Sequence, residues 1–208
     1  MLTNFTALAI DLDGTLLVGE SLPDENRRAV QAARDAGLQI IIATARWQHM
    51  ARRIATQLSI TGPIIACSGA QVHLPQENRD IFDERLPADF VAELYALCDA
   101  HRCVATVTVG DEVLLKLDGE PDRAQMSDEM RWVRKLTGAA DSLPRVAAIQ
   151  GTAVNDLIRS QLEPRFAATV HFLDSIGPSG KVILTLTGKR ASIGHACDTS
   201  RESSPAGS

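Results

Sequence analysis

The sequence predicts an α/β protein in which a mostly parallel sheet is followed by a second module of mixed α and β structure. Short apolar runs at 7–10, 38–43 and 63–66 each end in a polar turn, and helical patterns separate them. After about residue 80 this alternation gives way to β-rich units. Strands that alternate with helices through short connections are typical of a parallel sheet whose functional groups gather at the carboxyl ends of its strands.

The first half begins with a strand. Ala7–Ile10 is short and continuously apolar, which predicts a strand buried on both faces at the centre of a parallel sheet. Residues 21–36 carry a proline and two acidic residues at their start and apolar residues at helical spacing, and Gly37 stands in the stop position, so this segment should be a helix. The same patterns predict a strand at 38–43, a helix at 47–58 and a strand at 63–66.

The sequence after about residue 80 predicts two β-rich units, each with helices. Together they predict an antiparallel sheet with helices on one face. The Ser-rich end, 197–208, has little to bury and should be a disordered tail. The predicted elements are a helix at 88–101, a hairpin at 103–117, a helix at 127–136, a strand at 145–149, a helix at 154–162, and strands at 168–173 and 182–187. The predicted domains are 1–80, 81–186 and a return to the first domain at 187–208.

Composition indicates a soluble, cytoplasmic protein. The chain has 208 residues, of which 45% are hydrophobic, so it can bury a sizeable core. Its net charge of -5 does not provide the positive charge with which proteins bind nucleic acid or an anionic membrane surface. No stretch approaches the roughly 20 apolar residues that span a bilayer, and the start lacks the features of a secretion signal. Four irregularly placed cysteines fit free thiols better than a zinc module.

The strongest chemical signal is Asp11-Leu12-Asp13-Gly14-Thr15, directly after the first strand. Two carboxylates two residues apart project to the same side of an extended chain, so one can attack phosphorus while the other handles protons. A bound Mg²⁺ would offset their repulsion of a phosphate. An Asp-rich turn is the plain alternative. A calcium loop is excluded, because its required glycine and glutamate positions hold Leu16 and Leu22.

The string DLDGT resembles the first motif of the haloacid dehalogenase-like superfamily. The resemblance implies a Rossmann-like core with an inserted α+β cap domain, and hydrolysis of a small phosphorylated metabolite. By position, Asp11 would form an aspartyl-phosphate and Asp13 would act as general acid and base. Mg²⁺ would be held by Asp11 and by Asp13, including the Asp13 backbone carbonyl.

Two further segments resemble the Cof-type subfamily. Thr44 ends the 38–43 strand, where the family's second motif hydrogen-bonds a phosphoryl oxygen, although it could instead serve as a helix N-cap. Arg46 follows at the place of the Thr-Gly-Arg arginine and would contact substrate or position the helix start. Ser68 and Gly69 stand where Asn-Gly-Ala is usual, and backbone amides there would face a phosphate or the cap, unless this is an ordinary turn.

The end of the chain departs from the family pattern. Ser192-Ile193-Gly194 has the surroundings of the third motif but puts isoleucine in place of its lysine, and no Gly-Asp fourth motif follows. The alternative is therefore a truncated or frame-shifted remnant with little activity. A receiver-like phosphoacceptor also clusters aspartates, but the large inserted module opposes it. If the sheet lacks later strands, Ala7–Ile10 becomes an exposed apolar edge, which predicts a homodimer, another partner or poor solubility.

Overall fold

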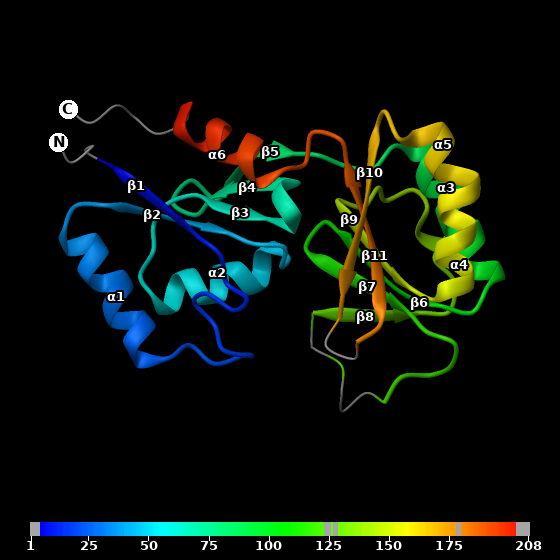
Figure 1. The fold of residues 1–208 in the computed structure, drawn as a ribbon, viewed down its shortest axis with the longest axis horizontal. Helices are drawn as coiled ribbons and strands as arrows, with labels where there is room; N and C mark the ends of the chain where they lie inside the picture. The colour runs from blue at the N-terminus through cyan, green and yellow to red at the C-terminus, as the bar shows by residue number, and fades with distance from the viewer. Residues whose placement is uncertain (1–4, 123–125, 127–128, 178–179, 203–208) are drawn as a thin grey trace. The chain divides into compact units, whose positions relative to one another are not determined.

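The computed structural model describes residues 5–122, 126, 129–177 and 180–202, and the chain forms two compact units (Figure 1). The first unit comprises residues 1–83 and 191–208, and the second comprises residues 84–190. Because the chain leaves the first unit and later returns to it, the second unit is an insertion in sequence. The mixed α/β class predicted from the sequence is confirmed.

The first unit is built on a sheet with the strand order β1-β2-β3-β4-β5. β1 to β3 are parallel, and β3, β4 and β5 are antiparallel neighbours. Its strands are β1 (Ala7–Ile10), β2 (Gln39–Ala43), β3 (Ile64–Ala66), β4 (Gln71–Leu74) and β5 (Arg79–Asp83). Its helices are α1 (Asp24–Asp35), α2 (Gln48–Gln57) and α6 (Ile193–Glu202). Ile10 pairs with Ile42, and Ile42 with Ile64, so the carboxyl ends of the three parallel strands are in register.

The position of β1 corrects the prediction of a central, doubly buried strand. Within the described part of the chain β1 stands at the end of the strand order, next to β2 alone. Leu8 is 39% exposed, whereas the strand β2 is buried from Ile40 to Ala43. The expected exposed apolar edge at Ala7–Ile10 is therefore confirmed.

The last helix also differs from the prediction. A disordered tail from Cys197 was the expectation, but α6 continues to Glu202, and residues 203–208 lie outside the described part. The Ser192 hydroxyl accepts a hydrogen bond from the His195 amide, as an N-cap does. Ala196 is fully buried against β2, β3 and β4. The cap and this small apolar contact explain why a Ser-rich segment is helical here.

The second unit is a sheet in the order β10-β11-β9-β6-β7-β8, and Figure 1 shows its helices on one face. All neighbours are antiparallel except β7 and β8. Its strands are β6 (Val104–Val109), β7 (Glu112–Lys116), β8 (Met130–Val133), β9 (Val146–Gln150), β10 (Val170–Ile176) and β11 (Val182–Gly188). Its helices are α3 (Ala88–Ala100), α4 (Thr152–Leu157), a π-helical turn at Ile158–Leu162 and α5 (Glu163–Phe166).

One predicted helix in this unit is wrong. The segment 127–136 contains β8, and its residues 127–128 lie outside the described part. Met130 pairs with Val113 and Trp132 with Leu115, so this short run adds a parallel strand to β7. Arg131 in this strand, and Arg134 and Lys135 just after it, are exposed.

The two ends of the second unit meet. The Arg190 guanidinium donates hydrogen bonds to Glu84 Oε2, one of them from Nε at 2.9 Å. A Cβ at Gly188 would lie 2.5 Å from the Glu84 side chain, so the glycine makes room for this ion pair. The Leu86 amide donates to the Pro144 carbonyl at 2.9 Å, which fixes the entering chain to the body of the unit.

Candidate active site

The loop after β1 places two carboxylates at the rim of the first unit. Leu12 is fully buried, while Asp11 and Asp13 on either side of it are exposed. The Leu17 amide donates to the Leu12 carbonyl at 2.8 Å and closes a tight turn, in which Gly14 takes a left-handed φ of 72°. The buried leucines anchor the turn, and both acidic side chains are exposed to solvent.

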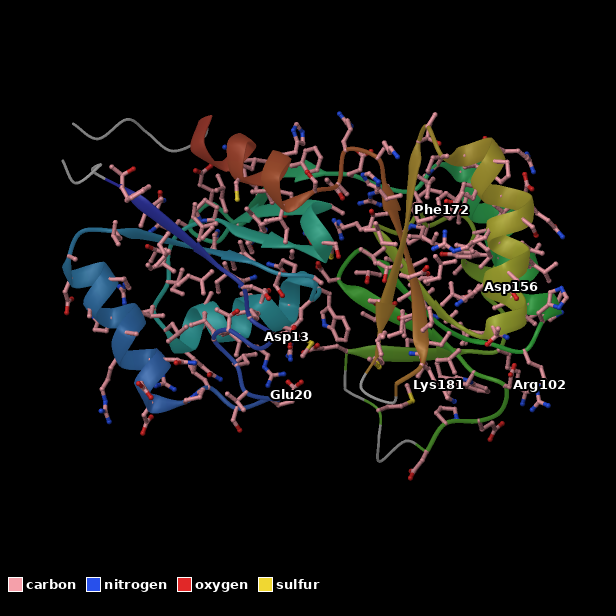
Figure 2. The ribbon with its side chains drawn as sticks, viewed as in Figure 1. Asp13, Glu20, Arg102, Asp156, Phe172 and Lys181 are labelled. Atoms are coloured by element: carbon pink, nitrogen blue, oxygen red, sulfur yellow. The ribbon has the colours of Figure 1, made fainter. Side chains whose placement is uncertain are left out.

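Arg46 holds the carboxylate of Asp13. Its Nε lies 2.9 Å from Asp13 Oδ2 and its Nη2 lies 2.6 Å from Oδ1, a two-pronged contact. The same guanidinium donates to both carboxylate oxygens of Glu20 at 2.9 Å. Figure 2 shows Asp13 and Glu20 in the segment that follows β1. The Arg46 side chain is only 13% exposed, so it is a nearly buried link between two exposed acids.

The pKa values of this cluster follow from its pairing. The pKa of Arg46 is raised, first by its hydrogen bonds to Asp13 and then by those to Glu20. The pKa of Glu20 is lowered, chiefly by its hydrogen bond from Arg46. Arg46 and Glu20 are therefore charged near neutral pH.

Thr44 directly follows β2 and is fully buried. Its hydroxyl accepts a hydrogen bond from the Arg46 amide at 3.2 Å. The alternative of a helix N-cap is wrong, because Trp47 occupies that position of α2. Since the hydroxyl oxygen accepts here, its hydrogen is left to donate to another group.

The turn that contains Ser68 and Gly69 is tight. Cys67, Ser68 and Gly69 have positive φ angles of 54°, 56° and 90°. The Ser68 amide donates to the Thr44 carbonyl at 3.2 Å, so it is engaged within the protein and not free for a phosphate. A Cβ at Gly69 would lie 2.3 Å from the Ser192 carbonyl carbon. The turn therefore packs against the start of α6, and a substrate contact from Ser68 or Gly69 stays a prediction.

Ile193 is the first residue of α6, directly after Ser192. The close approach of Gly69 to Ser192 and to the Ile193 amide places this residue beside the turn that follows β3. Its side chain is 40% exposed and apolar. At the place of the family's lysine the described structure thus has no charge.

The donor set fits Mg²⁺. Asp11 and Asp13 offer hard carboxylate oxygens, and Mg²⁺ is commonly held through one or two carboxylates with water and substrate phosphate. Across the described residues no group of three or more His, Cys, Asp and Glu side chains is arranged to hold a metal. An ion here would therefore depend on these two residues, the Asp13 carbonyl, water and the substrate.

Sequence reasoning did not find the role of Glu20. It lies seven residues beyond Asp13 in an irregular segment, where no periodicity distinguishes it from other acids. Its partner Arg46 lies 26 residues further on. What marks Glu20 is that it and Asp13 both contact Arg46, a nearly buried arginine, and this arrangement is visible only in the folded chain.

Three parallel strands with paired carboxylates after the first and a buried threonine after the second, together with an inserted α+β unit, are typical of α/β enzymes whose sites lie at the carboxyl ends of the strands. A model of the haloacid dehalogenase-like hydrolases matches residues 8–197, and the chain belongs to this family. The family predicted from DLDGT is confirmed.

Relatives of the chain are phosphatases. It is 39% identical over 96 residues to 5-amino-6-(5-phospho-D-ribitylamino)uracil phosphatase YcsE of Bacillus subtilis (strain 168), covering 45% of this chain and 38% of the relative. It is 41% identical over 70 residues to a phosphoglycolate phosphatase of Pyrobaculum aerophilum, covering 32% and 30%. These matches span well under two thirds of the relatives' own lengths.

Solved structures share the fold. A haloacid dehalogenase-like hydrolase from Bacteroides thetaiotaomicron matches with a TM-score of 0.79 and 17% identity, covering 96% of this chain and 77% of that one. Among the described residues no helix combines the length and apolarity needed to cross a membrane.

Proposed function

We propose that this protein hydrolyses a small phosphate monoester, such as a sugar phosphate, with Mg²⁺ and through an aspartyl-phosphate on Asp11. The observation that carries the proposal is the pair of exposed carboxylates, Asp11 and Asp13, on either side of the buried Leu12 in a chain of this family.

Each side chain has a defined task. A carboxylate oxygen of Asp11 attacks phosphorus, and the bond to the leaving oxygen breaks. Asp13 gives that oxygen a proton and then takes one from the water that hydrolyses the acyl phosphate. The two-pronged contact from Arg46 keeps the Asp13 carboxylate in one orientation. The Thr44 hydroxyl, whose oxygen accepts from Arg46, donates its hydrogen to a phosphoryl oxygen.

Mg²⁺ bound by Asp11 and Asp13 would neutralise charge between the carboxylates and the phosphate. The named relatives act on a phosphorylated ribitylaminouracil and on phosphoglycolate, which supports a small phosphorylated metabolite as substrate. Nucleic acid and membranes are not proposed as partners, since the net charge is -5. We place the protein in the cytoplasm, in keeping with four cysteines for which the described structure records no disulfide.

Turnover of p-nitrophenyl phosphate tests the proposal. We expect Mg²⁺-dependent release of p-nitrophenol by the unmodified chain, and a loss of about a hundredfold or more in Asp11→Asn, because an amide is a poor nucleophile. Glu25→Gln, an acid in the first turn of α1, is the matched control and should keep full activity. Equal release by the unmodified chain and Asp11→Asn would rule out the proposed chemistry.

A second reading, a family remnant with little turnover, is favoured by one observation. Ile193 cannot supply the positive charge of the lysine that it replaces, and loss of one preorganised charge costs on the order of a hundredfold in rate. The absence of any metal-dependent release from the unmodified chain would support this reading.

A further inference from the structure

A buried nucleophile lies beside a buried cation in the second unit. Cys103 directly precedes β6, and Lys116 ends the neighbouring strand β7, in register with Ala105. Cys103 is 4% exposed and Lys116 is 5% exposed. The Lys116 Nζ lies 3.5 Å from the Cys103 sulfur. None of these residues belongs to the candidate active site.

The surroundings of Lys116 favour a negative charge on Cys103. A buried ammonium is costly unless it is paired and hydrogen-bonded. Lys116 Nζ donates to the His101 carbonyl at 3.0 Å and lies 3.4 Å from Asp118. Asp118 is shared with Arg102, whose Nε lies 3.5 Å from it. The Asp118 carboxylate is thus shared between the charges of Lys116 and Arg102. A thiolate at Cys103 would add a second negative charge beside the buried Lys116 ammonium.

Cys98 supplies a second sulfur at the same place. It lies near the end of α3 and is fully buried. The Cys103 thiol donates to the Cys98 carbonyl oxygen at 3.5 Å, so the two residues are in contact. The pKa of Cys103 is lowered to about 7, first by the neighbouring Cys98 thiol and then by Lys116, against the opposing effects of burial and Asp118. The pKa of Cys98 is raised, so the two thiols differ in character.

We propose that Cys103 and Cys98 form a redox-active pair, in which Cys103 is the attacking sulfur and Cys98 the resolving one. The reactant is a small peroxide, because Cys103 is only 4% exposed. Thiolate character, more than exposure alone, decides which cysteine reacts.

The chemistry balances with hydrogen peroxide as oxidant. The Cys103 thiolate attacks one peroxide oxygen, the O–O bond breaks, and the departing hydroxide takes a proton to become water. Cys103 is then a sulfenic acid. The Cys98 thiol loses its proton as its sulfur attacks the Cys103 sulfur, the S–O bond breaks, and a second water leaves. Two thiols and one peroxide give one disulfide and two waters.

Mass mapping of the full chain tests the pair. The protein is treated with hydrogen peroxide at pH 7, remaining thiols are blocked under denaturing conditions, and trypsin is added. Because Arg102 separates the two cysteines, a disulfide joins two peptides, 86–102 and 103–116. We expect this linked species to form while Cys67, which is equally buried, stays available for blocking. No linked species, or oxidation of Cys67 at the same rate as Cys103, would overturn the proposal.

Two variants of Lys116 test whether its charge activates the Cys103 thiol or whether Lys116 is only a neighbour. Lys116→Met keeps the length and apolar stem of the side chain and should slow disulfide formation about tenfold at pH 7, with the rate recovering toward pH 9 as the thiol ionises unaided. Lys116→Arg retains the charge and should react nearly as fast as the unmodified chain. Circular dichroism of both variants is the control for folding. Equal rates in Lys116→Met and the unmodified chain at pH 7 would show that Lys116 does not activate Cys103.

Discussion

Ile193 is the residue at which this chain departs most clearly from its family. Its side chain is apolar and 40% exposed at the first position of α6, beside the turn at Gly69. On the proposed function, a positive charge at this position would hold the nucleophile and the phosphate together. Because the Ile193 side chain is exposed, a longer, charged side chain has room at this position.

We therefore expect Ile193→Lys to raise p-nitrophenyl phosphate turnover by about tenfold or more, since a preorganised charge near a phosphoryl group is worth at least that much. Steady-state kinetics with Mg²⁺ measures the gain. Gly194→Lys puts the same charge one residue further on, where a Cβ meets nothing within 4 Å, and should leave turnover unchanged. An equal gain in both variants would point to a general charge effect.

The individual site residues could be predicted only in part. Asp11 and Asp13 follow from a local pattern, a buried strand and a glycine turn, so their placement was predictable. The contact of Arg46 with Asp13 joins residues 33 apart in sequence and depends on the path from β2 into α2, which no local pattern specifies. The same holds for Glu20.

At the scale of elements, substitutions in the turn after β3 test how closely α6 packs against that turn. Gly69→Ala should destabilise the first unit by about 2–4 kcal/mol, because it combines a left-handed φ with a clash against the Ser192 backbone. Gly37→Ala, also at positive φ but with nothing within 4 Å, should cost only about 1–2 kcal/mol.

Urea unfolding followed by Trp47 fluorescence, in a Trp132→Phe background, reports on the first unit alone. Equal losses of stability in the two glycine variants would mean that α6 is not packed against this turn.

Element by element, the sequence patterns predicted the apolar and amphipathic segments and missed the rest. α1, β2, α2 and β3 have clear periodicity and clear stops, such as Gly37 with a φ of 85°. The hairpin β4–β5 was missed because its second strand is largely exposed and polar. β8 was taken for a helix because four residues are too few to show a period. Helix α6 depends on burial of Ala196, a tertiary contact.

For the whole molecule, the edge of the first unit's sheet bears on association. We propose that two copies pair through β1, because its outer edge carries unpaired backbone groups in the described structure and Leu8 is exposed. Light scattering should show a mass that rises with concentration from 22.4 kDa toward twice that value.

Leu8→Lys should suppress this rise, since a charge on an edge strand opposes pairing. Val18→Lys is the matched control: Val18 is an exposed apolar residue that lies outside the strands of the sheet, and the variant should associate like the unmodified chain. Concentration-independent monomer mass for the unmodified chain would exclude the dimer.

The ion pair between Glu84 and Arg190 has a consequence for how such a molecule changes over evolutionary time. Because Glu84 and Arg190, the first and last residues of the second unit, form an ion pair, the chain enters and leaves this unit at adjacent points. An inserted unit whose two ends are adjacent can be replaced by another unit, or shortened to a loop, without changing the order of the strands that precede Asp11 and Thr44.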